Sequence, residues 1–290
     1  MNGQLVQPEQ KLKRDADGFL RRTVWDLFSL KSRTIVITGG ARGIGLAFAF
    51  AIAEVGGNVA ILDALDEPHE HFYELQNRFK DLKFKSYKVD VTKYDVLEKA
   101  FDQVVKDFGR IDGLVTAAGI CTDEPFLERK PESVARCINI NVLGTYYAAQ
   151  LAAAQMARQE PTDFNQRGGS MVFIASIAAY VASKGQNTSD YCASKGAVVS
   201  LCKALGVELA AMGIRVNSIS PGYTMTDMTL DLCDRMPHLA HIMTTEPPMR
   251  RMADRTDLKG LVVYLLSEAS AYQTSEDILV TGGIHAGRLL

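Results

Sequence analysis

The stretch that decides the fold is residues 34–49, with the sequence TIVITGGARGIGLAFA. Residues 34–37 are β-branched or apolar and predict a buried strand. The glycines at 39, 43 and 45 predict a tight turn, because glycine adopts positive φ and lets other groups approach the backbone. A helix should then start near Leu46, with free N–H groups that suit a dinucleotide pyrophosphate. Glycine spacing alone is weak evidence, and a turn made only for packing is the alternative.

Six further apolar or β-branched runs follow, separated by segments long enough for helices. They are residues 59–62, 85–89, 113–115, 171–174, 214–216 and 278–280. This alternation predicts a Rossmann-type α/β fold: a three-layer, doubly wound parallel sheet of about seven strands. Ligands bind such sheets beyond the carboxyl ends of the strands.

The chain shows no break that would divide this sheet. We expect one catalytic domain over residues 31–290. Residues 1–30 are polar and charged up to residues 24–28, and we expect an N-terminal arm whose apolar end packs on the domain. No repeats or low-complexity linkers interrupt the pattern.

Composition favours small-molecule chemistry. The net charge is −2 and 47% of the residues are hydrophobic. The mixed charges give no footprint for nucleic acid or an anionic membrane. The first residues contain no continuous apolar stretch, so we expect a cytoplasmic protein without a membrane span. The five cysteines form no CxxC pair, which favours reduced thiols and no metal site.

Acidic residues follow the second and third strands. Asp63 lies about twenty residues beyond the glycine turn, where a carboxylate accepts hydrogen bonds from adenosine ribose hydroxyls and repels a 2′-phosphate. It predicts NAD rather than NADP, and the two residues after it supply no second cation. Arg42 argues the other way, because a guanidinium is a good phosphate ligand. Asp90 either bonds the adenine or caps the next helix.

A tyrosine and a lysine provide the expected reaction chemistry. Tyr191 and Lys195 are four residues apart and therefore share one face of a helix. A nearby cation favours phenolate, so we expect the pKa of Tyr191 to fall towards the working range of a general acid/base. Tyr180 and Lys184 have the same spacing, but the loop-like residues 185–187 follow them. We therefore assign the chemistry to Tyr191.

Two more polar residues are expected near Tyr191. Ser176 directly follows the fifth strand, so its hydroxyl should reach the substrate oxygen and support charge on it. Ser183 and Ser189 are alternatives, although loop serines usually serve turns or caps. Asn141 lies on a predicted helix, where a buried amide would hold a water that relays protons to Lys195. A satisfied core amide is the other interpretation.

Together these residues resemble the short-chain dehydrogenase/reductase family, over nearly the whole chain after Phe28. The resemblance rests on the glycine turn, on the tetrad of Asn141, Ser176, Tyr191 and Lys195, and on Pro221-Gly222 followed by Thr226. It implies an NAD(P)-dependent oxidoreductase acting on CH–OH or C=O, with hydride moving to or from nicotinamide. It also implies that Lys195 holds the nicotinamide ribose, and that homodimers or homotetramers form through the helices bearing Asn141 and Tyr191.

The expected cofactor site combines these family positions with the residues discussed above. It comprises Gly39, Arg42, Gly43, Ile44, Gly45, Asp63, Asp90, Val91, Ala118, Gly119, Tyr191, Lys195, Pro221, Gly222, Thr224 and Thr226. The chain departs from the family pattern at Ala117, where asparagine is usual, and at Thr281, where aspartate is usual. The segment from Ser176 to Tyr191 is also long. These departures bear on local stability and substrate shape more than on activity.

The segment after Pro221-Gly222 should cover the substrate as a lid, about residues 223–250. Its apolar residues are Met225, Met228, Leu230, Leu232, Met236, Leu239, Ile242 and Met243. Methionine-rich surfaces adapt to irregular apolar shapes, so the first expectation is a neutral, largely apolar secondary alcohol or ketone. One face of an amphipathic lid helix would explain the same residues.

Two rival functions remain at this stage. Residues 247–272 resemble the sorbose-reductase and sugar-alcohol dehydrogenase branch, especially its fungal members. That resemblance implies a polyol 2-dehydrogenase, or ketose reductase. A non-redox enzyme or a cofactor-binding protein on the same scaffold is the third hypothesis, because fold does not determine function.

Overall fold

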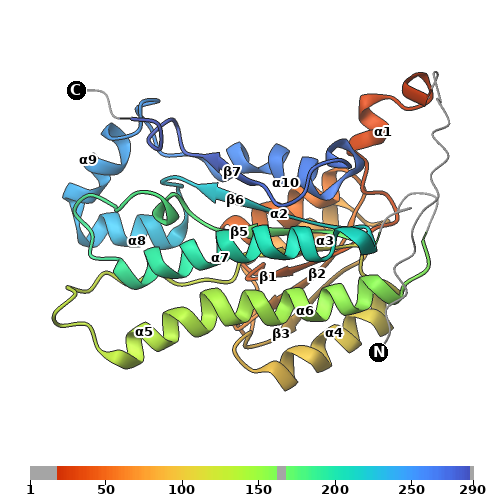
Figure 1. Ribbon diagram of the computed structural model, residues 1–290, viewed down its shortest axis with the longest axis horizontal. Coiled ribbons are helices and arrows are strands. Elements are labelled where there is room, and N and C mark those ends of the chain that lie inside the picture. The colour runs from red at the N-terminus through yellow and green to blue at the C-terminus, as the bar shows by residue number, and fades with distance from the viewer. Residues whose placement is uncertain (1–17, 162–167, 288–290) are drawn as a thin grey trace.

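The computed structural model describes residues 18–161 and 168–287. Its centre is a seven-stranded parallel sheet with strand order β3-β2-β1-β4-β5-β6-β7 (Figure 1). The strands are β1 (Thr34–Thr38), β2 (Asn58–Asp63), β3 (Phe84–Lys88), β4 (Gly113–Thr116), β5 (Gly169–Ile174), β6 (Ile214–Pro221) and β7 (Asp277–Val280). The predicted doubly wound sheet is confirmed, and each observed strand overlaps one of the predicted runs.

Helices cover both faces of the sheet. One layer contains α2 (Gly43–Glu54), α3 (His71–Arg78) and α10 (Lys259–Leu266). The other contains α4 (Tyr94–Phe108), α6 (Gly144–Arg158) and α7 (Ser189–Glu208), with α5 (Pro131–Ile138) packed against α7. Ile35 and Ile37 of β1 belong to the first core and Val36 to the second. Because both faces are buried, the central strands β1, β4 and β5 are largely apolar without alternation, whereas the edge strand β3 (FKSYK) is only partly buried.

Short helical segments connect these elements. They are η1 (Gly18–Leu20), η2 (Asn139–Leu143), η3 (Ile177–Ala179), η4 (Ala210–Met212), η5 (Arg255–Leu258) and η6 (Glu268–Ser270). The η2 segment is a π-helix that joins α5 to α6. None of the helices in the described ranges is long and apolar enough to cross a membrane.

The end of the expected arm is only partly packed. Residues 1–17 of the arm lie outside the described residues. In α1 (Val24–Phe28), Thr23 and Asp26 form a capping box that begins the helix. Phe28 packs against Tyr264, with ring centroids 6.2 Å apart. Val24 and Trp25 face solvent, so the expected packing holds for Phe28 but not for the start of the apolar segment.

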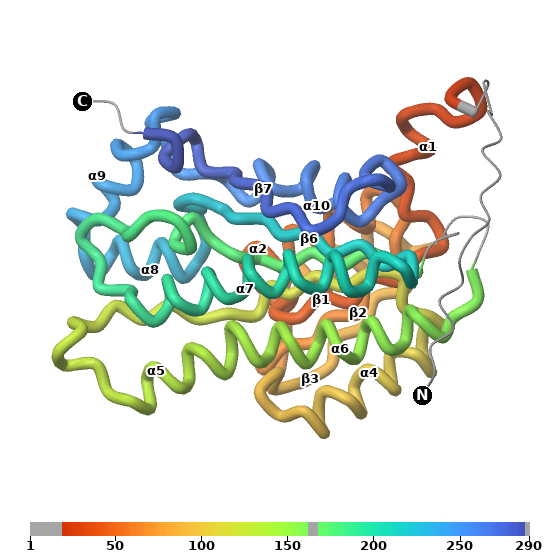
Figure 2. The backbone as a smooth tube through the Cα atoms, viewed as in Figure 1, coloured from red at the N-terminus to blue at the C-terminus, as the bar shows by residue number. Residues whose placement is uncertain are grey.

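The expected lid forms a small unit at one end of the sheet, where α8 (Asp227–Arg235) and α9 (Pro237–Thr245) follow β6 (Figure 2). It has a core of its own, made of Cys233, Leu239, Met243 and Met252. Because this core is separate from the two cores of the sheet, α8 and α9 pack as a distinct unit beyond the carboxyl end of β6.

Candidate active site

The glycine turn after β1 is closely packed. Gly39 has φ of 70° and Gly43 of 59°. A Cβ on Gly39 would lie 2.5 Å from the Cα of Ala118, and a Cβ on Gly45 would lie 2.2 Å from the Gly39 carbonyl oxygen. Side chains at these two positions would therefore clash with backbone. At Gly43 nothing lies within 4 Å, so the start of α2 is open to a ligand.

A cavity of about 370 Å³ begins at this turn. The expected cofactor residues that line it are Gly39, Arg42, Gly43, Ile44, Gly45, Asp63, Asp90, Val91, Ala118, Gly119 and Thr226. The glycine turn, the N-terminus of α2 and the acidic residues that line this cavity fit an adenine dinucleotide. The structure therefore brings together residues that lie far apart in the sequence and that a nicotinamide cofactor would need.

The two acidic residues of this cavity have different surroundings. The Ala41 N–H donates to Asp63 Oδ2 (3.0 Å), and the Leu65 N–H donates to Asp63 Oδ1 (3.1 Å). Asp63 is thus held at the end of β2, beside the glycine turn. Asp90 Oδ1 accepts from the backbone and the hydroxyl of Thr92, which shapes the turn before α4. Asp90 therefore does not cap α4, whose N-cap is Lys93 without a side-chain cap bond, and the capping interpretation was wrong. Asp90 does line the cavity.

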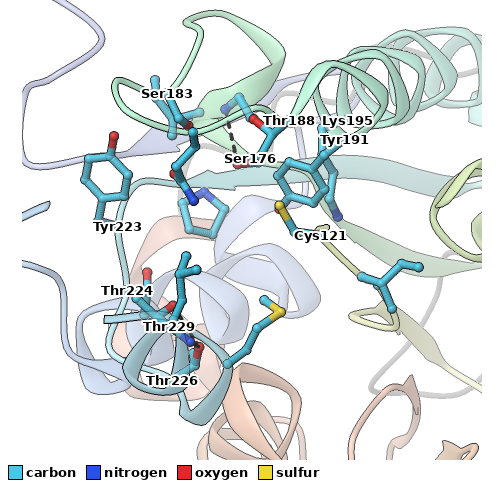
Figure 3. Close-up of a pocket in the computed structure, with 18 of the residues that line it drawn as sticks. Cys121, Ser176, Ser183, Thr188, Tyr191, Lys195, Tyr223, Thr224, Thr226 and Thr229 are labelled. Carbon is cyan, nitrogen blue, oxygen red and sulfur yellow. Dashed lines mark hydrogen bonds between the residues drawn. The ribbon is translucent and has the colours of Figure 1, made fainter. Parts of the chain in front are cut away.

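A second cavity, of about 500 Å³, lies next to the first and shares Ile44, Gly119 and Thr226 with it. The remaining expected site residues that line it are Ser176, Tyr191, Lys195, Pro221, Gly222 and Thr224. Figure 3 shows Ser176, Tyr191 and Lys195 grouped on one side, with Thr224, Thr226 and Thr229 on the other. Ser176 emerges after β5 and caps η3, where its Oγ accepts from the Ala178 N–H (3.1 Å).

The electrostatics of Tyr191 differ from the sequence-based expectation. Burial raises the pKa of Tyr191, and a hydrogen bond with Ser176 acts in the opposite direction with a smaller effect. The expected lowering was therefore wrong. The Lys195 Nζ donates to the Ile174 carbonyl (2.7 Å) and lies 5.6 Å from the centroid of the Tyr191 ring. Burial lowers the pKa of Lys195 from 10.5 to about 8. The structure thus holds Tyr191 as a neutral phenol, which is a proton donor.

Asn141 lies buried in the π-helix η2. Its amide Nδ2 donates to the Ile120 carbonyl and to Ser194 Oγ, both at 2.9 Å, and its Oδ1 accepts from the Ile120 N–H. Ser194 in turn donates to the Tyr191 carbonyl (2.8 Å). These contacts support the interpretation of Asn141 as a satisfied core amide that ties the loop after β4 to α7. Sequence reasoning missed Ser194, for which the sequence carries no signal.

The competing tyrosine–lysine pair is engaged elsewhere. The Tyr180 hydroxyl donates to Asp277 Oδ2 (2.7 Å), which also accepts from Ser220 (2.8 Å). Lys184 forms an ion pair with Glu246 (2.9 Å). Both members of the pair therefore hold segments of the fold together, and neither lines the two cavities described above.

For the apolar residues of the expected lid, the structure supports both explanations, each for a different subset of residues. Met228, Leu232, Met236 and Met243 line the second cavity. Leu239 and Ile242 instead pack within the lid, while Met225 and Leu230 are exposed. The same cavity has a polar wall that sequence reasoning did not identify, apart from Ser183. This wall comprises Thr122, Asp123, Glu124, Ser183, Gln186, Thr188 and Arg235.

Comparison with known proteins decides the family. A family model described as enoyl-(acyl carrier protein) reductase matches residues 39–285. The chain belongs to the short-chain dehydrogenase/reductase family. A short-chain type dehydrogenase/reductase from Mycobacterium marinum is 34% identical, with a TM-score of 0.81 over 90% of this chain and 99% of that one. As a member of the family, the chain is an oxidoreductase that acts on CH–OH or C=O groups with a nicotinamide cofactor.

Two curated members of the short-chain dehydrogenase/reductase family are similar over most of their length. Sorbose reductase sou1 of Schizosaccharomyces pombe is 35% identical over 89% of this chain and 97% of its own. The NADP-dependent mannitol dehydrogenase of Hypocrea jecorina is 34% identical over 89% of this chain and 94% of its own. These relatives agree with the branch that residues 247–272 indicated.

Proposed function

We propose that this protein interconverts a polyol and a ketose, with NAD(H) as cofactor and Tyr191 as the residue that transfers the proton. The observation that carries the proposal is the polar wall of the cavity next to Tyr191. Ser183, Gln186 and Thr188 line it before α7, and Arg235 lines it from the lid. A hydroxyl-rich substrate would need such donors and acceptors, whereas a plain apolar ketone would leave them unpaired. The similarity to sorbose reductase and mannitol dehydrogenase supports the same substrate class.

The chemistry assigned to the chain's own residues follows from their surroundings. When bound, the nicotinamide supplies or accepts the hydride. In the reduction, the neutral Tyr191 phenol gives its proton to the substrate oxygen, and Ser176 donates a hydrogen bond to that oxygen. In the oxidation, Tyr191 takes the proton back. The buried Lys195 ammonium lies over the Tyr191 ring, where its positive charge favours the phenolate once the proton has left.

The preference for NAD rests on Asp63. Its carboxylate is held beside the glycine turn, where it would accept from ribose hydroxyls and repel a 2′-phosphate. Arg42 and Arg136 also line this cavity, and the mannitol dehydrogenase relative is NADP-dependent. The preference is therefore tested directly. If Asp63 sets it, Asp63→Ala will raise kcat/KM with NADPH relative to NADH by at least tenfold, whereas a wild-type enzyme that prefers NADPH contradicts the proposal.

The first test of the function is a substrate panel. The purified protein is mixed with NADH or NADPH and with D-fructose, L-sorbose, cyclohexanone or an aryl ketone, and absorbance is followed at 340 nm. We expect oxidation of NADH with at least one ketose, and oxidation of the matching polyol in the reverse direction. Turnover confined to the apolar ketones would contradict the polyol assignment.

An apolar secondary alcohol or ketone remains the second candidate, because four apolar lid residues face the same cavity. The two candidates depend on opposite walls. Gln186→Leu should lower kcat/KM for a ketose and leave that for an apolar ketone unchanged or higher. Met236→Ala should have the larger effect if the substrate is apolar. The ratio of the two effects decides between the candidates.

A further inference from the structure

A buried ion pair lies at the start of α7, among residues to which no role has yet been given. Arg129 and Asp190 pair through Nη1 and Oδ2, and their side chains are only 2% and 1% exposed. Moving two charges out of water is costly, so such a pair is weak evidence for stability by itself. The position of the pair beside the cavity therefore says more about its role than its burial does.

The Arg129 guanidinium ties together two loops that form part of the cavity wall. It donates to the carbonyls of Thr122 (3.2 Å) and Glu124 (2.9 Å) in the loop after β4. It also donates to the Asn187 carbonyl in the loop before α7. The planar, forked guanidinium makes these several contacts at once, which a lysine ammonium cannot reproduce in the same geometry.

The two loops also bind each other directly. The Glu124 N–H donates to the Asn187 carbonyl (3.2 Å), and the Asn187 N–H donates to Asp123 Oδ1 (2.9 Å). Asp190, the partner of Arg129, accepts from the Tyr191 N–H through its other oxygen (2.8 Å). One chain of contacts therefore runs from the substrate wall through Arg129 and Asp190 to the backbone of Tyr191.

We propose that Arg129 is a positioning residue for the reaction, which holds Tyr191 and the polar wall of the cavity as one rigid unit through Asp190. The proposal rests on the proposed function in so far as Tyr191 transfers the proton. It assigns no contact with substrate to Arg129, whose guanidinium is committed to the loops and to Asp190.

Arg129 also balances a buried negative charge near Tyr191. The titratable groups around the Tyr191 hydroxyl are Cys121 after β4, Cys137 on α5, and Cys192 and Lys195 on α7. Asp190 acts on two of them, because its charge raises the pKa of Cys121 and of Cys137. Removing either partner would leave the other as an unpaired buried charge beside the cavity wall.

The test compares Arg129→Met, Arg129→Lys and Asp190→Asn with the wild type, using separate measurements of kcat and KM for oxidation. The matched control is Arg33→Met, which breaks another buried pair, with Glu268, away from the site (side chains 6% and 15% exposed). Hydrogen exchange of residues 119–130 and 185–191, measured without substrate, gives a readout that does not depend on turnover.

We expect Arg129→Met and Asp190→Asn each to lower kcat at least tenfold and to speed exchange in both segments. KM should change less than kcat, because neither side chain is assigned a contact with substrate, and Arg129→Lys should keep an intermediate kcat. Arg33→Met should lower Tm without changing kcat or the hydrogen exchange of either segment. If Arg129→Met does not fold, Arg129→Lys and Asp190→Asn carry the test.

Unchanged exchange and unchanged kcat in the Arg129 and Asp190 variants would overturn the inference, even if Tm fell as in Arg33→Met. Failure of the proposed function has a different signature. In that case Tyr191→Phe would keep full turnover, or the wild type would turn over none of the substrates in the panel. The exchange experiment would still report whether Arg129 couples the two loops to Tyr191.

Discussion

Tyr180 and Tyr191 each precede a lysine by four residues, yet their hydroxyls have different partners. Tyr180 donates to Asp277, while Tyr191 faces the cavity beside Ser176. We predict that Tyr191→Phe lowers kcat by about 10²–10⁴, the range of general acid–base catalysis. Tyr180→Phe should keep kcat and cost about 1 kcal/mol of stability, because one hydrogen bond is lost. Turnover assays and urea unfolding measure the two effects; loss of turnover in Tyr180→Phe alone would reverse the assignment.

Lys195 should make stability depend on pH. Its pKa is about 8 in the folded chain, against 10.5 for the ordinary side chain. Between these two values the unfolded chain binds the proton more strongly, so the wild type gains stability as the pH rises. Below pH 8 both states are protonated and the full cost of the buried charge is present. Lys195→Met lacks this dependence.

We therefore expect the stability of the wild type relative to Lys195→Met to rise by up to about 3 kcal/mol from pH 8 to 10.5, at 1.36 kcal/mol per pKa unit. Thermal melts of both proteins across this range measure it. The cysteine thiols are common to both proteins and cancel in the difference. A constant difference in Tm would mean that Lys195 is not desolvated as the structure indicates.

At the scale of elements, the sheet and the glycine turn were predictable because their signals are local. A strand buried on both faces is a continuous apolar run, as in β1, where all five residues are buried. Gly39 and Gly45 are required by close backbone contacts next to that strand. The carboxyl ends of the strands then place Asp63 and Ser176 without further information.

Other features of the site depend on contacts between distant segments. Arg129 and Asp190 look like ordinary surface charges in the sequence, and only the fold buries them together. The hydrogen bonds of Asn141 depend on the π-helix η2, which has no signature in its sequence. The pKa of Tyr191 is set mainly by its burial, and spacing along a helix does not determine this. Local patterns predicted which residues meet, but not how they are held.

The lid should respond to its own small core. Leu239 is fully buried there, while Leu230 on α8 is 42% exposed. We predict that Leu239→Ala loosens α8 and α9 and raises KM for the substrate several-fold, because a cavity is left in a core with few other contacts. Leu230→Ala is the matched control and should leave KM unchanged. Steady-state kinetics together with limited proteolysis of residues 223–250 test this; equal KM values in the two variants would show that the lid does not limit binding.

At the scale of the whole molecule, the helical layer of α5, α6 and α7 does two tasks. On its inner side, Lys195 on α7 and Asn141 in η2, which joins α5 to α6, are buried, and Tyr191 on α7 lines the cavity. On its outer side, apolar side chains remain exposed: Val134 (37%), Tyr146 (45%) and Val207 (73%). Because the family resemblance implies subunit contacts through these helices, we infer that these exposed apolar groups lie in a subunit interface. Assembly would then also restrict motion of the helix that carries Tyr191.

We therefore predict a homodimer or homotetramer whose contacts involve α5, α6 and α7. Multi-angle light scattering after gel filtration should give two or four times the chain mass. The double variant Tyr146→Lys/Val207→Lys should shift the mass downwards and lower kcat, since like charges would then be buried without partners. Tyr272→Lys, at a fully exposed position in the turn after η6, is the control and should change neither. If that control lowers the mass while the double variant keeps it, the interface lies on the opposite side, and α7 must hold Tyr191 by the contacts within one chain.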